Sequence, residues 1–88
     1  MGDVIVEIKV MPESTETDLD RIKGEVMEKI GYKIIDAQKK PIAFGLSSLN
    51  LKFLIPDEGG ILSEITEKIE RIQGVESTDV VSVSRALG

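Results

Sequence analysis

Two side chains in this sequence are well placed to act on another molecule, and they offer different chemistry. Phe44 is one of only three aromatic residues and lies in segment 41–46, which is almost wholly apolar (Pro-Ile-Ala-Phe-Gly-Leu). A ring in such a segment can fill an apolar pocket on a partner. Arg85 is the only basic residue after Arg71, and its planar guanidinium can pair with an anionic site.

Segment 41–46 lies between two expected strands, where a polar connection is usual. Pro41 fixes its backbone angle and Gly45 permits conformations closed to other residues. Connections carry function more often than framework elements do, which favours a contact surface for another molecule. Phe44 can instead be a core residue at the start of a strand, and Arg85 a solvated cation at a strand end. From the residues alone, both interpretations stay open.

Covalent chemistry has little support in this sequence. The chain contains neither His nor Cys, which removes the commonest general base, the commonest metal ligands and any disulfide. Glu64, Glu67 and Glu70 fall on the polar side of an expected helix and are typical of a solvated face. Segment 57–60 (Asp-Glu-Gly-Gly) precedes that helix but lacks the P-loop lysine, which indicates a plain turn. We expect no catalytic residue, no metal site and no cofactor.

The composition indicates one small acidic domain. The 88 residues suffice for one hydrophobic core and 41% of them are apolar, so we expect a single domain over residues 1–88. Sixteen acidic and eleven basic residues give a formal charge of −5, which repels nucleic acid and anionic membranes and suits a partner with a basic face. No apolar run approaches the roughly 20 residues that span a bilayer. We expect a cytoplasmic protein that binds neither nucleic acid nor membrane.

Four segments of the chain have the alternating pattern of strands. The alternation is clearest where Val4, Val6 and Ile8 share one face, and in the segment that contains Phe53. The expected strands cover 3–11, 33–40, 49–55 and 75–85. In the last of these, Val81 and Val83 are expected to face one way, and the opposite face is expected to carry Thr78, Val80 and Ser82.

Two further segments have apolar residues at helical spacing. The first runs through 19–30, includes Met27 in its apolar stripe, and is expected to begin at a Thr17 hydroxyl cap and stop at Gly31. The second runs through 62–72 and is closed by Gly74.

The order of these elements is β-α-β-β-α-β. Two crossings of this type place both helices on one face of a four-stranded antiparallel sheet, which is the ferredoxin-like sandwich of the α+β class. The opposite face stays open and mixed in character, and such faces often bind other molecules. The residues expected on it are Ile5, Glu7, Lys9, Asn50, Lys52, Leu54, Val80 and Ser82. The fold alone does not select a function.

Three segments together resemble a known family. Residues 11–14 (Met-Pro-Glu-Ser), 41–46 and 75–80 (Val-Glu-Ser-Thr-Asp-Val) are similar to the exchange-domain family of elongation factor 1-beta, in its archaeal form. The resemblance covers nearly the whole chain with the same element order. Segment 41–46 is its most specific part.

The resemblance implies a guanine-nucleotide exchange factor that promotes GDP release and GTP reloading on elongation factor 1-alpha during translation elongation. In that family the loop matching 41–46 presents its ring to the GTPase, which assigns Phe44, with Pro41, Ile42 and Gly45, to partner binding. A lysine near the C-terminus of eukaryotic members reaches toward the magnesium and phosphate site, and Arg85 holds the matching position here. Arginine keeps the charge but is bulkier and planar.

Exchange requires no covalent catalysis, in agreement with a chain that is not an enzyme and that lacks His and Cys. We expect the protein to act as a monomer. The alternative is a small-molecule-binding regulatory module of the ACT type, which shares the βαββαβ order. Sites of that type favour a glycine-bearing turn directly after the first strand, where this chain has Met11-Pro12-Glu13.

Overall fold

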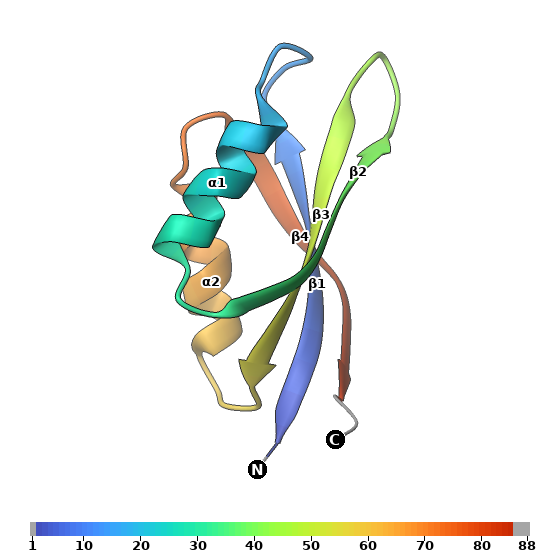
Figure 1. Ribbon diagram of the computed structural model, residues 1–88. Helices are drawn as coiled ribbons and strands as arrows, with labels where there is room; N and C mark the ends of the chain where they lie inside the picture. Colours follow the sequence, from blue (N-terminus) through green and yellow to red (C-terminus); the bar gives the residue numbers. More distant parts are fainter. Residues whose placement is uncertain (1, 86–88) are drawn as a thin grey trace.

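A computed structural model describes residues 2–85 of the chain (Figure 1), so Met1 and residues 86–88 of the expected domain lie outside the described part. The order of elements is β-α-β-β-α-β, as the sequence predicts. The elements are β1 (Asp3–Pro12), α1 (Leu19–Lys29), β2 (Lys33–Pro41), β3 (Ser47–Pro56), α2 (Ile61–Glu70) and β4 (Val75–Arg85).

The four strands form one antiparallel sheet in the order β2-β3-β1-β4. Both helices lie on the same face of this sheet, and the other face carries no helix (Figure 1). The expected ferredoxin-like sandwich is confirmed. β2 and β4 are the two edges, and the hairpin between β2 and β3 projects at the end of the sheet farthest from both described termini.

The core lies between the sheet and the helices, because the alternation of β1 and β3 directs every second residue toward the helices. Phe53 is fully buried and is the largest side chain of this core. Both central strands contribute four buried residues each, and the helices supply most of the rest: Val4, Val6, Ile8, Val10, Leu49, Leu51, Phe53, Ile55, Leu19, Ile22, Val26, Ile65 and Ile69. Met27, expected in the apolar stripe of α1, is instead 60% exposed.

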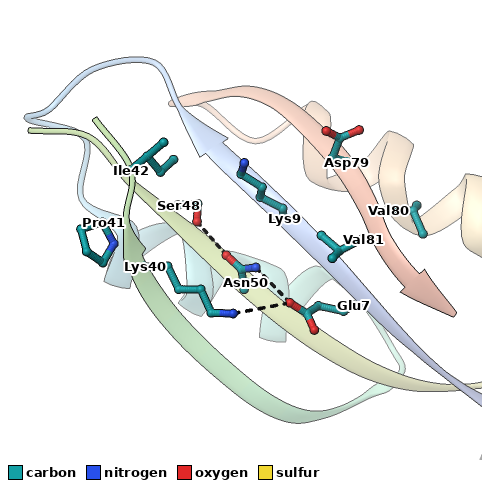
Figure 2. A pocket seen from close by; sticks show the side chains of 10 residues that line it. All are labelled: Glu7, Lys9, Lys40, Pro41, Ile42, Ser48, Asn50, Asp79, Val80 and Val81. Carbon is teal, nitrogen blue, oxygen red and sulfur yellow. Dashed lines mark hydrogen bonds and ion pairs between the residues drawn. The ribbon is translucent and has the colours of Figure 1, made fainter. Parts of the chain in front are cut away.

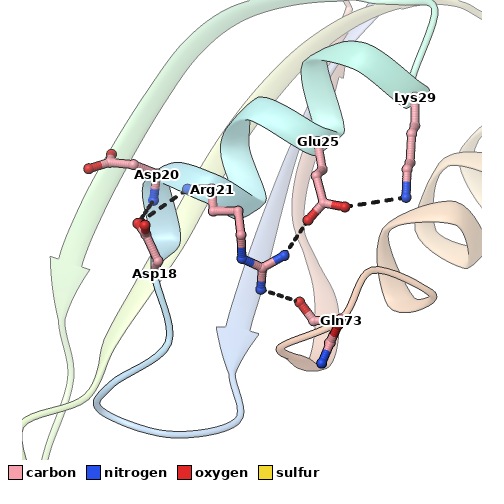
Figure 3. Close-up of polar contacts among 6 residues, drawn as sticks. All are labelled: Asp18, Asp20, Arg21, Glu25, Lys29 and Gln73. Atoms are coloured by element: carbon pink, nitrogen blue, oxygen red, sulfur yellow. Dashed lines mark hydrogen bonds and ion pairs between the residues drawn. The ribbon is translucent and has the colours of Figure 1, made fainter.

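The start of α1 is capped by Asp18 and not by Thr17 (Figure 3). The Asp18 carboxylate accepts hydrogen bonds from the backbone N–H groups of Asp20, at 3.0 Å, and Arg21, at 3.2 Å. The Thr17 hydroxyl instead accepts a hydrogen bond from the backbone N–H of Ser14, in the loop before the helix, at 3.2 Å. Thr17 therefore shapes the loop, and the carboxylate next to it satisfies the free donors of the helix.

Gly31 does not end α1 in the expected way, because Ile30 closes the helix in an extended conformation and Gly31 has no positive φ. Gly74, before β4, does need to be glycine. Its φ is 99° and a Cβ there would lie 2.9 Å from Nη2 of Arg21. The same Arg21 nitrogen donates to the Gln73 carbonyl at 2.6 Å (Figure 3), which ties α1 to this loop.

β4 departs from simple alternation. Its register against β1 shifts between Glu7 and Ile8, so that Ser82 pairs with Glu7 while Val80 pairs with the buried Ile8. Val81 is the extra residue of this bulge. The regular alternation expected for residues 78–83 is therefore interrupted, since a bulge cannot be seen in a hydrophobic pattern.

Candidate functional site

The tip of the β2–β3 hairpin is a tight turn stabilised by two backbone hydrogen bonds. The Ile42 N–H donates to the Leu46 carbonyl at 2.8 Å, and the Leu46 N–H donates to the Ala43 carbonyl at 2.9 Å. Phe44 and Gly45 both have positive φ, of 55° and 78°. Glycine adopts a positive φ at no steric cost. Gly45 therefore permits the tight turn, as expected for a glycine in this segment.

Phe44 points its ring into solvent from this tip, with 97% of the residue exposed. The interpretation of Phe44 as a core residue is therefore wrong. It is the one non-glycine residue with positive φ among those described, a conformation that costs an ordinary L-residue roughly 1 kcal/mol. A large ring held outward on a strained backbone adds nothing to the core and lowers the stability of the turn.

Pro41 and Ile42 continue this apolar surface from the tip toward the sheet. Pro41 is the last residue of β2 and pairs with Ser47 across the hairpin, and its peptide bond is trans. Ile42 follows it and is 45% exposed. The structure thus brings Pro41, Ile42, Phe44 and Gly45 together in one projecting hairpin end.

Arg85 lies at the opposite end of the sheet from this hairpin. It pairs with Val4, which in turn pairs with Ile55 near the end of β3, whereas Ser47 begins that strand. Eight strand residues at about 3.3 Å each separate the two ends by about 26 Å. The Arg85 side chain is 79% exposed, and its Nη1 lies 3.8 Å from an Asp57 carboxylate oxygen. It is an accessible cation with one loose, solvent-screened partner.

Between these two ends, the face of the sheet without helices carries a polar network that the sequence did not reveal as a site (Figure 2). The Ser48 hydroxyl donates to Oδ1 of Asn50 at 2.7 Å, and the Asn50 amide donates to Glu7 at 3.0 Å. Lys40 extends its ammonium to 4.0 Å from the same carboxylate. Ser48 and Asn50 are buried although no helix covers them. Two polar residues among the apolar residues of β3 were the available signal.

This network forms the floor of a depression of about 500 Å³. Its walls come from the hairpin on one side and from the bulged part of β4 on the other (Figure 2). The lining residues are Glu7, Lys9, Lys40, Pro41, Ile42, Ser48, Asn50, Asp79, Val80 and Val81. Two of them, Pro41 and Ile42, also belong to the apolar hairpin end.

Neither a metal centre nor a membrane segment is found in residues 2–85. No group of three acidic residues there has the geometry of a metal site, and neither α1 nor α2 has the length and apolar character needed to cross a bilayer. The turn before α2 contributes no side-chain cap to that helix.

Solved structures with the same architecture include an ACT domain from the GTP pyrophosphokinase of Chlorobium tepidum. Its solution structure aligns with a TM-score of 0.73 over 93% of this chain and 90% of that domain, at 22% identity. The C-terminal domain of the MgtC protein from Mycobacterium tuberculosis aligns with a TM-score of 0.63 over 97% of this chain and 89% of that domain, at 11% identity. At such identities the similarity establishes the fold alone.

Relatives with higher identity are archaeal proteins named elongation factor 1-beta. The one from Methanothermobacter thermautotrophicus is 39% identical, with 99% of this chain and 100% of that protein aligned. The one from Saccharolobus solfataricus is 40% identical, with 97% of each chain aligned. Residues 5–86 match the model of the EF-1 guanine nucleotide exchange domain. On this evidence the chain belongs to the EF-1 guanine nucleotide exchange domain family.

Proposed function

We propose that residues 1–88 act as one exchange domain that promotes GDP release and GTP reloading on elongation factor 1-alpha. The observation that carries the proposal is the ring of Phe44, 97% exposed at the tip of a strained turn. Membership of the exchange-domain family gives the activity class. The relatives' shared name, elongation factor 1-beta, points to the elongation GTPase as the partner.

The exchange reaction follows from linkage between two ligands of the GTPase. If the complex with this domain weakens nucleotide binding, nucleotide must weaken the complex by the same factor. No covalent bond is made or broken in this scheme. The domain therefore needs surfaces that contact the GTPase and no catalytic groups. An apolar ring and a cation suit that role, and the −5 charge of the chain suits a basic face on the partner.

Phe44 serves in this proposal as the apolar anchor, with Ile42 and Pro41 widening the contact and Gly45 permitting the turn. A buried aromatic anchor is commonly worth about 2 kcal/mol or more when truncated, which is about 30-fold in affinity. Because the ring makes no contact that stabilises the free domain, its whole apolar surface is available to a partner.

Arg85 serves as a competing cation. A guanidinium that approaches the phosphates of bound GDP repels Mg²⁺ and competes with it for the phosphate oxygens, which weakens the binding of Mg²⁺ to the nucleotide. Its ion pair with Asp57, in which the side chains are 79% and 49% exposed, is weak enough to be released when a partner binds.

Release of a fluorescent GDP analogue from elongation factor 1-alpha of the same organism, chased with excess unlabelled nucleotide, tests the proposal. We expect acceleration at micromolar domain, and a smaller acceleration for Arg85→Ala, whose deficit shrinks when Mg²⁺ is removed by chelation. No acceleration by the wild-type domain would reject the function. An Arg85→Ala variant equal to wild type at all Mg²⁺ levels would reject only the assigned role of this cation.

A further inference from the structure

The two proposed contact points, Phe44 and Arg85, lie at opposite ends of the sheet, whose strand β3 spans about 26 Å from Ser47 to Ile55. A partner that reaches both must pass over one face or edge of the sheet. α1 and α2 cover one face, whereas the face without helices is open to a partner up to the β4 edge, where Arg85 pairs with Val4 (Figure 1). A partner on the open face meets the depression between the hairpin and the β4 bulge. This reasoning rests on the proposed function.

Lys9 and Asp79 stand out within the depression because they are opposite charges without an ion pair. They face each other across β1 and β4 in the register of the sheet, and both line the depression (Figure 2). In the described part of the chain, however, neither has an opposite charge within 4.0 Å. Glu7 and Lys40, in contrast, already contact each other. One cation and one anion are therefore left available side by side.

The surroundings of this pair are ordered and partly apolar. The Ser48–Asn50–Glu7 chain of hydrogen bonds holds the floor, with Ser48 and Asn50 buried. Ile42 and Val81, exposed by 45% and 53%, form apolar walls at either side. A rigid polar centre between apolar margins can fix the orientation of a protein partner through complementary charges.

We propose that the helix-free face is a second contact surface for elongation factor 1-alpha, in which Lys9 and Asp79 recognise an acidic and a basic side chain of that GTPase. The acidic side chain of the partner lies against Lys9 and its basic side chain lies against Asp79. The contact is continuous with the hairpin end, because Pro41 and Ile42 line both. The pair fixes the direction in which the domain lies on its partner.

Charge reversal tests the proposal, with affinity for the nucleotide-free GTPase as the readout. Lys9→Glu and Asp79→Lys should each weaken binding by about tenfold, since each places like charges together. The double swap Lys9→Glu/Asp79→Lys restores the net charge and again places one charge of each sign at these two facing positions. It should keep the wild-type melting temperature yet bind no better than the single variants, because both charges then meet the wrong partner group.

A matched control and a local probe complete the experiment. Lys23→Glu makes the same charge change on α1, which covers the opposite face of the sheet, and should alter affinity less than twofold beyond the general effect of net charge. Asn50 is the only asparagine of the chain, so the NMR signals of its side-chain amide report on the floor and should shift when the GTPase binds.

Several outcomes overturn the proposal. Recovery of affinity in the double swap would show that the partner does not distinguish which position holds the cation and which the anion, and equal binding of Lys9→Glu and Lys23→Glu would show that only net charge matters. Either result leaves the proposed function intact, provided that the wild-type domain still accelerates GDP release. If it does not accelerate release, the proposed function fails, and this inference fails with it.

Discussion

Phe44 combines full exposure with a positive φ of 55°. For both reasons it contributes little to the stability of the domain. The ring gains no free energy from burial, and the backbone of Phe44 has a φ angle that is free of steric strain for glycine. We expect Phe44→Gly to raise the free energy of unfolding by about 0.5–1 kcal/mol relative to Phe44→Ala, which keeps the backbone strain. Chemical denaturation checks this difference. Equal stability of the two variants would mean that the turn is unstrained.

Gly74 is the residue whose replacement should damage the fold most for its size. Its φ is 99°, and a Cβ would lie 2.9 Å from Nη2 of Arg21 and 3.0 Å from Cγ2 of Thr17. We expect Gly74→Ala to lower the free energy of unfolding by about 2 kcal/mol. Gly59→Ala is the control, because a Cβ there meets nothing within 4 Å and φ is not positive. A loss no larger than that of Gly59→Ala would contradict this account of the loop.

At the scale of single residues, the sequence shows which side chains are present but does not determine which of them are exposed. From the residues alone Phe44 fitted both a core position and a contact, because an aromatic residue next to Pro and Gly suits both the start of a strand and a loop; the family resemblance was what favoured the contact. Asn50 and Ser48 gave even less signal, since they are buried beside residues of other strands: Asn50 donates to Glu7 of β1, and Ser48 pairs with Lys40 of β2. Only the three-dimensional structure separates these cases.

Among the secondary-structure elements, α1 is joined to β2 by one well-formed ion pair. Nζ of Lys39 lies 2.8 Å from a carboxylate oxygen of Asp20. The hydrogen bond from Lys39, aided by its positive charge, lowers the pKa of Asp20 below its ordinary value. A lowered pKa in the folded state means that the pair stabilises the fold above the unfolded pKa and that this contribution is lost as the pH falls through the folded value.

An NMR titration of the Asp20 carboxyl measures this coupling. In Lys39→Ala the pKa of Asp20 should rise toward its ordinary value, while Lys40→Ala, one residue further on, should leave it unchanged. An Asp20 pKa that is the same in wild type and Lys39→Ala would show that the ion pair does not persist in solution.

The central strands were predicted better from the sequence than the edge strand β4, for a physical reason. β1 and β3 are central strands in which every second residue from Val4 to Val10 and from Leu49 to Ile55 is apolar and buried, so their hydrophobic alternation is easy to recognise. β4 is an edge strand with exposed Val80, Val81 and Val83 and a bulge, and the alternation expected for it is therefore interrupted. Edge strands often carry bulges, which protect them from pairing with other chains.

On the scale of the whole molecule, the distance between Phe44 and Arg85 is the fact that the sequence could not supply. It depends on the register of β4 against β1 and of β1 against β3, which joins residues far apart in the sequence, such as Val4 with Ile55 and with Arg85. The βαββαβ order was predictable from local patterns. The arrangement of the two proposed contact points at opposite ends of the sheet required the sheet itself.

The charge of the whole domain should govern how fast it meets its partner. With a formal charge of −5, association with a basic face is electrostatically steered and is screened by salt. We expect the association rate to fall several-fold between about 0.05 M and about 0.5 M salt, with a much smaller change in the dissociation rate. Stopped-flow mixing measures both rates. An association rate independent of salt would contradict a basic docking face.

The most direct test of the central claim compares GDP release by elongation factor 1-alpha in the presence of wild-type domain, Phe44→Ala and Phe44→Leu. We predict that wild type accelerates release, that Phe44→Ala needs about 30-fold more protein for the same effect, and that Phe44→Leu lies between them. All three should melt as folded domains, because the ring is 97% exposed. A folded Phe44→Ala domain that accelerates release as well as wild type would contradict the account.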